Sequence, residues 1–359
     1  MASTIPSPET VEIETSDGLT LRCRRYRRPG ARAVVCGHGQ ASNAYQFDLP
    51  LYGFSVAEQL YELGYEVWLV NFRGAGHPPW QSDGGDGLNS GDQMGALDFP
   101  AVIDRVIEET GKPPFYIGHS FGGMSLYIYL QGVVFDDDGR SGIRRDPQVA
   151  RERNGKIAAA LTAGSPAGTA EEVLDTMERV RRHPWVQAVA RRMVRFLLKR
   201  AGKKPVIPIG RISIRFGFAH PWLARVLMHS PLMKAYMQPR MMTREACGVF
   251  GTWAGGDVTC VHAAQSVDTV MTGGLTSFDA SGKKALVYQE GMSDITVPLA
   301  AAAGTRDFMR PVDIKEKVLG AVSSEHTLFL PIQGCGHIDM VYHLPLPEVM
   351  DWMEWATKH

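Results

Sequence analysis

The sequence predicts an α/β fold with a mostly parallel, twisted sheet, helices on both faces and a mainly helical insertion. Short apolar runs typical of buried strands alternate with segments of helical periodicity up to residue 165, and the alternation returns after residue 281. Residues 166–281, between them, have mostly helical periodicity. We therefore expect a core in two parts, residues 1–165 and 282–359, with a helical cap or lid at residues 166–281.

The predicted elements follow one another along the chain in a regular order. Two alternating stretches joined by Ser16-Asp17-Gly18 predict an N-terminal β-hairpin. After the hairpin, strands alternate with helices along the chain. This alternation predicts right-handed crossover connections and hence parallel pairing of the strands. The further strands are expected at residues 33–36, 66–70, 115–117, 157–161, 285–288 and 327–331, and helices at residues 54–63, 93–110, 124–130 and 345–355.

The composition is that of an ordinary globular protein. Lys+Arg and Asp+Glu both number 38 among 359 residues, and this zero net charge argues against nucleic acid as the main partner. No stretch is apolar for long enough to predict a membrane span, and the N-terminal residues show no targeting signal. The five cysteines form no C-x-x-C pair, which indicates neither a disulfide framework nor a zinc site. We expect a soluble cytoplasmic protein with reduced cysteines.

The most specific motif is Gly118-His119-Ser120-Phe121-Gly122, a G-x-S-x-G between a predicted strand and a predicted helix. A turn this sharp holds the serine in a strained backbone conformation and exposes its hydroxyl at a helix N-terminus. There, unpaired N–H groups and the helix dipole favour developing negative charge. Ser120 is therefore the candidate nucleophile.

A serine hydroxyl attacks only when a base removes its proton, and that base in turn needs a carboxylate. His337, in a glycine-rich turn after the last predicted strand, is the candidate base. Asp294, just past the predicted strand at residues 285–288, is the candidate acid, although it could instead cap a helix after Pro298. The other aspartates considered for the acid are Asp268, Asp279 and Asp339.

The remaining site residues are predicted from their places beside these motifs. The loop His38-Gly39-Gln40 follows the third strand, so the backbone N–H groups of Gln40 and Phe121 are expected to form an oxyanion hole. Four neighbours of the motifs are predicted to line the substrate site, and they are His38, His119, Met292 and Ile338.

Together, the HG-x loop, the G-x-S-x-G elbow, the acid loop and the G-x-G-H turn resemble the α/β-hydrolase superfamily. Within it, the chain is most similar to the acid-lipase-like branch, through Gly64–Gly74, Asp98–Asp104 and Thr110-Gly111. The resemblance implies a carboxylic ester hydrolase without cofactor or metal, acting on a small-molecule or lipid-like ester. The chain departs from that branch in lacking a secretion signal and a disulfide pattern, so a gastric or lysosomal role does not transfer.

The predicted function is ester hydrolysis through Ser120, His337 and Asp294, with an acyltransferase, a thioesterase, a lactonase or a silent binding protein as alternatives. Methionines and aromatics in the predicted cap favour a hydrophobic acyl group. Residues 179–244 contain no Asp or Glu, and the basic, amphipathic helix at residues 185–200 has three interpretations. It could pack on the core with a solvated basic face, make a peripheral contact with an anionic membrane, or attract a carboxylate or phosphate substrate such as a coenzyme A thioester. The oligomeric state is left open.

Overall fold

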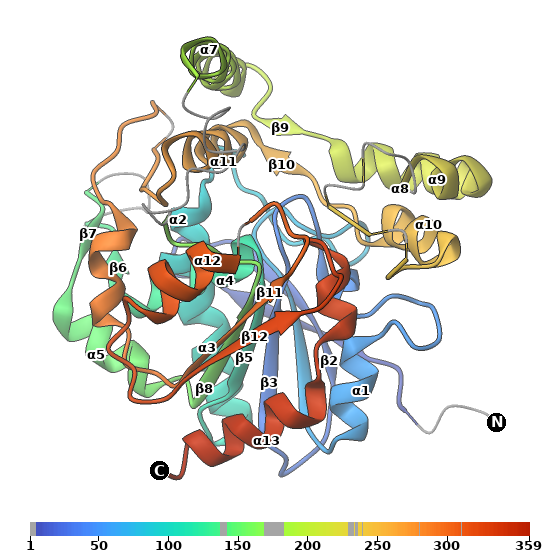
Figure 1. The fold of residues 1–359 in the computed structure, drawn as a ribbon, viewed down its shortest axis with the longest axis vertical. Helices are drawn as coiled ribbons and strands as arrows, with labels where there is room; N and C mark the ends of the chain where they lie inside the picture. Colours follow the sequence, from blue (N-terminus) through green and yellow to red (C-terminus); the bar gives the residue numbers. More distant parts are fainter. Residues whose placement is uncertain are drawn as a thin grey trace.

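The computed structural model (Figure 1) describes residues 5–136, 142–168, 183–228, 233, 236–238, 240–279, 281–309 and 311–359. Part of the predicted cap, including residues 169–182, lies outside the described residues. Among the described helices, none combines the length and the apolar character needed to cross a bilayer.

An eight-stranded sheet forms the centre of the molecule, in the order β1-β2-β4-β3-β5-β8-β11-β12. β2 pairs antiparallel with both β1 and β4, and the other pairs in the sheet are parallel. The predicted N-terminal hairpin and the mostly parallel sheet are thus confirmed. The strands are β1 (Glu9–Glu14), β2 (Thr20–Tyr26), β3 (Ala33–Gly37), β4 (Glu66–Asn71), β5 (Phe115–His119), β8 (Ala159–Ala163), β11 (Leu299–Gly304) and β12 (Thr327–Ile332).

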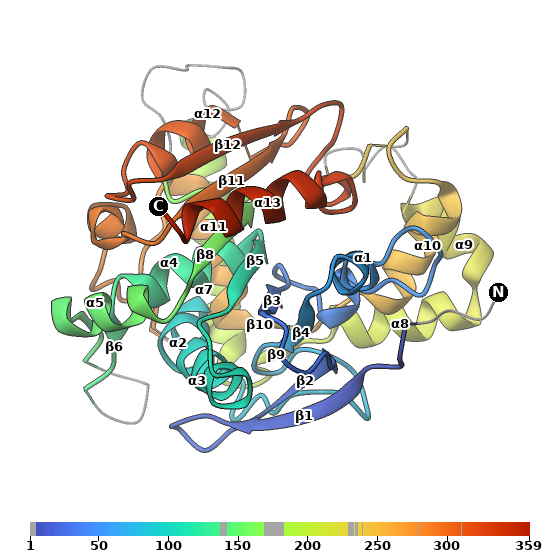
Figure 2. The same cartoon turned by 90° about the horizontal axis from the view of Figure 1, so that it is seen from below.

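Helices cover both faces of the sheet (Figure 2) because the central strands are apolar on both sides. In β3, Ala33 and Val35 face one buried cluster, while Val34 and Cys36 face the other. The first cluster contains residues of α3 (Phe99–Thr110) and α4 (Phe121–Leu130). The second contains residues of α1 (Val56–Glu62) and α13 (Leu346–Ala356).

One predicted strand is wrong. Residues 288–294 form the 3-10 helix η4 (Tyr288–Asp294), and the next strand of the sheet is β11, with the sequence LAAAAG. Alanine favours helices over strands, so local propensity argued for a helix after Pro298. The strand forms because parallel neighbours, β8 and β12, pair with it on both sides and every residue in it is buried.

The segment between β8 and β11 is mainly helical, as the sequence predicts, and lies over the ends of the strands from which Ser120 and His337 emerge (Figure 1). Its helix α11 packs along α7, and α10 packs on α8 and α9. Whether residues 166–281 form a separate domain stays a prediction. The elements are α7 (Pro184–Ala201), β9 (Val206–Ile207), α8 (Ile209–Ala219), α9 (Pro221–Met228), α10 (Arg244–Trp253), β10 (Val258–Thr259) and α11 (Cys260–Thr272).

Short elements connect these layers. A two-stranded ribbon and one helix lead from α4 to β8, and several single turns precede or follow the strands. They are η1 (Ala44–Gln46), α2 (Gly91–Gln93), the π-helical turn η2 (Met94–Asp98), β6 (Val133–Val134), β7 (Arg144–Arg145), α5 (Pro147–Gly155), α12 (Pro311–Ile314), η5 (Lys315–Leu319) and η6 (Asp339–His343).

Candidate active site

Ser120 occupies a strained turn between β5 and α4. Its backbone angles are φ 50° and ψ −118°, a conformation that non-glycine residues rarely adopt and that costs about 1–3 kcal/mol. Close packing holds the turn, because a methyl group on Gly122 would lie 2.3 Å from the carbonyl oxygen of Gly37. The predicted sharp strand-to-helix turn is therefore present, with the serine at the N-terminus of α4.

Three side chains touch in series at this turn. The Ser120 Oγ lies 2.9 Å from His337 Nε2. On the other side of the ring, His337 Nδ1 lies 3.0 Å and 3.1 Å from the two carboxylate oxygens of Asp307. The Asp307 carboxylate is fully buried and also accepts a hydrogen bond of 2.8 Å from the Met309 N–H. With the histidine oriented by a carboxylate, its Nε2 faces the serine as a proton acceptor.

The prediction that Asp294 is the acid is wrong, because Asp307 occupies that place. Asp294 ends η4, before β11 begins, and it is exposed; its backbone carbonyl accepts a hydrogen bond from Asn154 at the end of α5. Asp307 follows the carboxyl end of the same strand. Because the carboxyl ends of parallel strands share one edge of the sheet, a residue after β11 can reach Ser120 and His337, whereas a residue before β11 lies at the opposite edge.

The sequence contains a pattern that indicates Asp307. Residues 299–303 are a short apolar run ended by Gly304, which is the pattern of a fully buried strand. Recognising that strand would have placed the candidate acid in the turn at residues 305–307. Gly164, which follows β8 with φ +62°, leaves room for the pair, since a methyl group there would lie 3.0 Å from the His337 ring.

The other aspartates considered for the acid have structural roles. Asp339 accepts hydrogen bonds from the N–H groups of Gly336 and Gln238, which holds the turn that carries His337. Asp268 forms an ion pair with Lys284 at 2.6 Å. Asp279 accepts hydrogen bonds from Ser281 and Lys283 within its own turn.

His119 braces the backbone of His337. Its Nε2 lies 2.9 Å from the His337 carbonyl oxygen and its Nδ1 lies 2.6 Å from Gln46 Nε2. The carbonyl requires a donor, so Nε2 carries the proton and Nδ1 accepts. Gln46 Oε1 then accepts the Gly39 N–H at 2.9 Å. A single chain of hydrogen bonds thus joins the loop after β3 to the loop of His337.

His38 is bonded in a similar way within its own loop. Its Nδ1 donates to the Gly39 carbonyl at 2.8 Å, and its Nε2 accepts the Phe72 N–H at 3.3 Å. Burial lowers the pKa of His38 to about 4 and holds the pKa of His119 well below its usual value, so both rings stay neutral. Both nitrogens of each ring are bonded within the protein, so the rings brace the two loops. Whether His38 and His119 also line the substrate site stays a prediction.

The predicted oxyanion donors lie beside Ser120. A methyl group on Gly39 would lie 3.2 Å from the Ser120 Cβ, so the His38-Gly39-Gln40 loop passes directly over the serine. Within the described part of the chain, the Gln40 and Phe121 backbone N–H groups have no acceptor. An N–H pair of this kind can receive a developing oxyanion.

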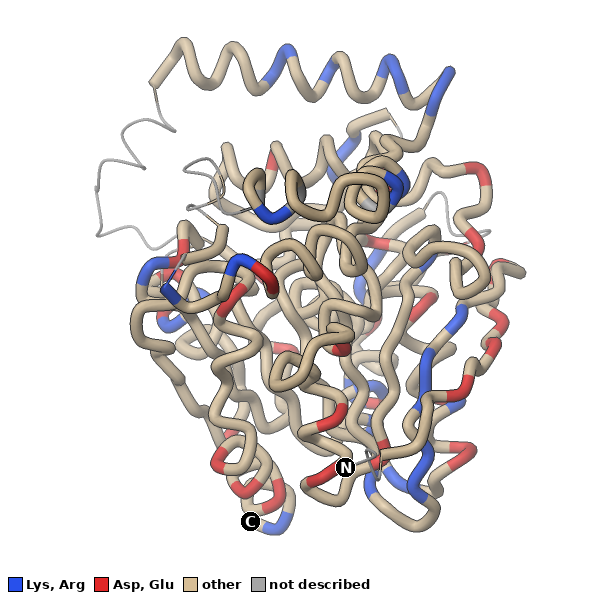
Figure 3. Tube along the Cα trace, turned by 90° about the vertical axis from the view of Figure 1, so that its right-hand side faces the viewer, with Lys and Arg blue, Asp and Glu red and all other residues tan. Residues whose placement is uncertain are grey.

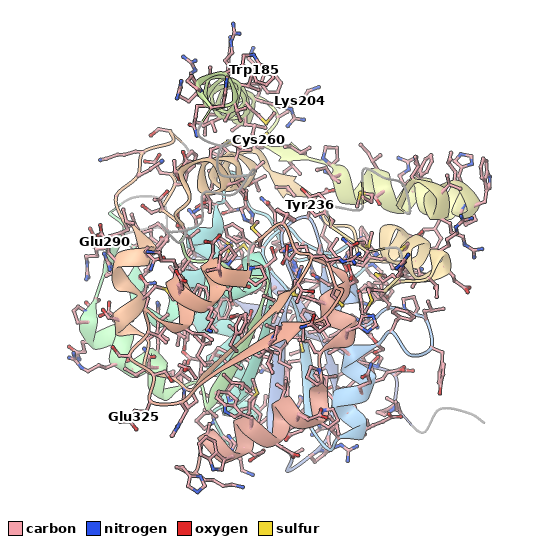
Figure 4. The ribbon with its side chains drawn as sticks, viewed as in Figure 1. Trp185, Lys204, Tyr236, Cys260, Glu290 and Glu325 are labelled. Carbon is pink, nitrogen blue, oxygen red and sulfur yellow. The ribbon has the colours of Figure 1, made fainter. Side chains whose placement is uncertain are left out.

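Aromatic rings flank the three side chains. The ring centre of Phe308 lies 4.9 Å from that of His337, and the ring centre of Tyr236, labelled in Figure 4, lies 6.4 Å from it. Next to Ser120, Phe121 packs edge-on against His262 of α11 with ring centres 4.1 Å apart. Burial lowers the pKa of His262 to about 3, so this ring is neutral as well.

The last two predicted substrate residues have different outcomes. Met292 is buried and contacts Gln131 at the C-terminal end of α4, whereas Ser120 lies at the N-terminal end of that helix. Its prediction as a substrate residue is therefore wrong. Ile338 follows His337 and packs against the apolar cluster of Tyr45 and Leu49, and its role in substrate binding stays a prediction.

The chain is similar to known proteins in sequence and in fold. The sequence family described as alpha/beta hydrolase fold matches residues 32–132, which include the loop after β3 and the Ser120 turn. Lipase 1 of Drosophila melanogaster is 32% identical over 126 residues, 33% of this chain and 29% of the relative. Human gastric triacylglycerol lipase is 35% identical over 130 residues, 32% of each chain. The chain thus spans about a third of the length of these curated relatives.

Solved structures extend the likeness in fold to nearly the whole chain. The alpha/beta hydrolase GrgF from Penicillium sp. sh18 superimposes with a TM-score of 0.58 at 17% identity, covering 99% of this chain and 100% of that one. The Paleococcus ferrophilus monoacylglycerol lipase gives a TM-score of 0.53 at 16% identity, covering 94% and 99%. At such identities the likeness shows the fold alone. The chain is an α/β-hydrolase-fold protein, lipase-like in sequence over about a third of its length.

Proposed function

We propose that the chain is a serine hydrolase that cleaves a carboxylic ester through an acyl-enzyme. The observation that supports this most strongly is the unbroken series of contacts from Ser120 to His337 to Asp307. A serine on a strained turn, an imidazole within hydrogen-bond distance and a buried carboxylate behind it are the parts that nucleophilic acyl transfer needs.

In the first half of the reaction, Ser120 Oγ attacks the ester carbonyl and its proton passes to His337 Nε2. The imidazolium is stabilised by Asp307, to which its Nδ1–H donates. The negative charge that forms on the carbonyl oxygen is received by the Phe121 and Gln40 N–H groups. His337 then returns the proton to the leaving alcohol as the C–O bond breaks, which leaves the acyl group on Ser120.

In the second half, water replaces the alcohol. His337 takes a proton from water, the hydroxide attacks the acyl carbonyl, and the same N–H groups receive the oxyanion. The proton returns to Ser120 Oγ as the carboxylic acid departs. Both halves use the same side chains, Ser120, His337 and Asp307, and the same pair of backbone N–H groups.

The surroundings of the site support a hydrophobic acyl group. Tyr236 and Phe308 lie beside His337, and Phe121, which packs against His262, directly follows Ser120. Aromatic rings near both His337 and Ser120 favour an apolar chain over a charged one. The similarity to lipases points the same way.

Ser120→Ala is the direct test. Turnover of p-nitrophenyl esters with acyl chains of graded length should fall by about 10⁴-fold or more, because removal of the nucleophile leaves only the oxyanion donors and binding. Ser125→Ala is the matched control, since Ser125 is buried in α4, the helix that Ser120 precedes, and its hydroxyl has no hydrogen-bond partner among the described residues. Ester turnover by Ser120→Ala at the wild-type rate would overturn the proposed function.

A further inference from the structure

Helix α7 presents a mixed apolar and basic face to solvent. Ala190, Leu197 and Ala201 are its buried residues, and α7 packs along α11. Residues three, four and seven apart share a helix face, so a second row of residues runs along the side opposite to these. This row, named the outer stripe, consists of Trp185, Val189, Arg192, Phe196 and Lys199.

The apolar members of the outer stripe are unusually exposed. Trp185 is 69% exposed, Phe196 64% and Val189 41%. In Figures 1 and 4, α7 with Trp185 lies at the top of the molecule, above α11. Large exposed aromatic side chains gathered on one face are characteristic of a surface that binds another protein or a membrane.

The charges of the same helix face have one sign. Arg192 and Lys199 are exposed, and neither has an acidic partner among the residues that the structure describes. Figure 3 shows Lys and Arg along α7 without Asp or Glu, whereas acidic residues are frequent in the core below. In the sequence, no Asp or Glu occurs from Arg179 to Arg244. A partner for this face must therefore carry negative charge.

We propose that the outer stripe docks the protein on a lipid bilayer that contains anionic headgroups. A helix in the plane of a membrane surface buries apolar and aromatic side chains among the lipids while its basic side chains contact phosphate groups, and the outer stripe supplies both along one line. Beside the stripe, a cavity of about 520 Å³ between α7 and α11 is lined by Arg191 and Arg195 and by Asp268, which pairs with Lys284.

Two other occupants fit the stripe less well. A second copy of the chain would place one basic face against another, and the like charges would repel. A nucleic acid would accept the cations but would leave Val189 without an apolar partner. A lipid surface with anionic headgroups offers negative charge and an apolar layer at once.

Docking through α7 would turn the site toward the membrane. α11 lies beneath α7, and its His262 contacts Phe121 beside Ser120, so the outer stripe and the Ser120 turn are at the same end of the sheet. Binding itself requires no chemistry, so this inference does not rest on the proposed function.

Co-sedimentation of the full chain with vesicles tests the proposal. We expect binding to phosphatidylcholine vesicles that contain phosphatidylserine, weak binding to pure phosphatidylcholine, and a steep loss of binding as salt is added. Arg192→Gln with Lys199→Gln should weaken binding to the anionic vesicles by about 25-fold, since each cation near such a surface contributes about fivefold. Trp185→Ser with Phe196→Ser should weaken it by about tenfold or more.

The matched control removes one aromatic and one basic side chain from outside α7. Tyr52 is 98% exposed and Arg151 is exposed, so Tyr52→Ser with Arg151→Gln should bind as the wild type does. Equal binding to the two kinds of vesicle, or anionic binding unchanged by either pair of stripe variants, would overturn the proposal. So would a dimer or a nucleic-acid complex that the stripe variants abolish while vesicle binding persists. The Ser120→Ala protein should bind normally, which keeps this result separate from that of the proposed function.

Discussion

The two ends of strand β11 each carry an aspartate, and the two have opposite surroundings. Asp294, before the strand, is exposed at the edge of the sheet where the parallel strands begin. Asp307, after the strand, has a fully buried carboxylate held by His337 and by the Met309 N–H. The residue type is the same at both ends, so the direction of the strand decides which aspartate can serve the serine.

The largest difference between the two ends is expected from conversion of each aspartate to asparagine. Asp307→Asn should lower kcat by about 10⁴-fold, because the amide no longer fixes the tautomer of His337 or stabilises its positive charge. Asp294→Asn should leave kcat within about twofold, as expected for an exposed side chain distant from the reaction. Steady-state kinetics on an ester substrate decides, and a large loss in Asp294→Asn with none in Asp307→Asn would reverse the comparison.

Alanine substitutions of glycines at the two edges of the sheet should also differ in their effect on kcat. Gly39→Ala places a methyl group 2.9 Å from His119 Nδ1, so the loop that carries the Gln40 N–H must move. Displacing one oxyanion donor should reduce kcat by about 10²-fold with little change in KM. Gly155→Ala, at the end of α5 before β8, meets no atom within 4 Å and is the control. Equal kcat values for the two variants would show that the Gln40 N–H is not part of the oxyanion hole.

The hydrogen-bond chain from Gly39 through Gln46 and His119 to His337 should have a smaller effect. His119→Phe and Gln46→Leu are each expected to lower kcat about tenfold, because both release the backbone of His337 without touching substrate. Since both variants break one chain, the double variant should lose little more than either single one. Additive losses in a double-mutant cycle would show that the two residues act independently.

The smallest expected effect is one of pH on stability. An unfolded histidine binds a proton near pH 6.5, whereas the pKa of folded His262 is lowered to about 3. Below pH 6.5 the unfolded state therefore binds more protons, and stability falls as the pH falls, by about 2 kcal/mol between pH 6.5 and pH 5 for each such group. In urea unfolding, the free energy of unfolding of His262→Phe should fall by about 2 kcal/mol less than that of the wild type between pH 6.5 and pH 5. An identical pH dependence would show that His262 is not buried as a neutral ring.

Most of the fold could be predicted from local patterns. Strands with branched and aromatic residues, such as β4 and β5, and amphipathic helices, such as α3 and α7, were recognisable from periodicity. β11 was not, because its alanines favour a helix locally and become a strand only between β8 and β12. That single error moved the candidate acid to the wrong end of the strand.

In the candidate site, too, some residues could be predicted from local patterns and others could not. Ser120 and His337 lie in glycine-rich motifs whose spacing is visible in the sequence. The bracing roles of His38 and His119 were not visible, because they depend on Gln46 and Phe72, which folding brings to them. A histidine next to a nucleophile motif suggests a substrate contact. In His38 and His119, however, both ring nitrogens form hydrogen bonds with the protein itself.

Labelling with a fluorophosphonate, followed by peptide mass spectrometry, tests the activation of Ser120 most directly, because the reagent reacts only with a serine whose hydroxyl a neighbouring base has made nucleophilic. We predict one adduct, on Ser120, formed at the same rate in the wild type and in Asp294→Asn, far more slowly in Asp307→Asn, and absent in His337→Ala. An adduct on another residue, or an Asp307→Asn protein labelled as fast as the wild type, would contradict it.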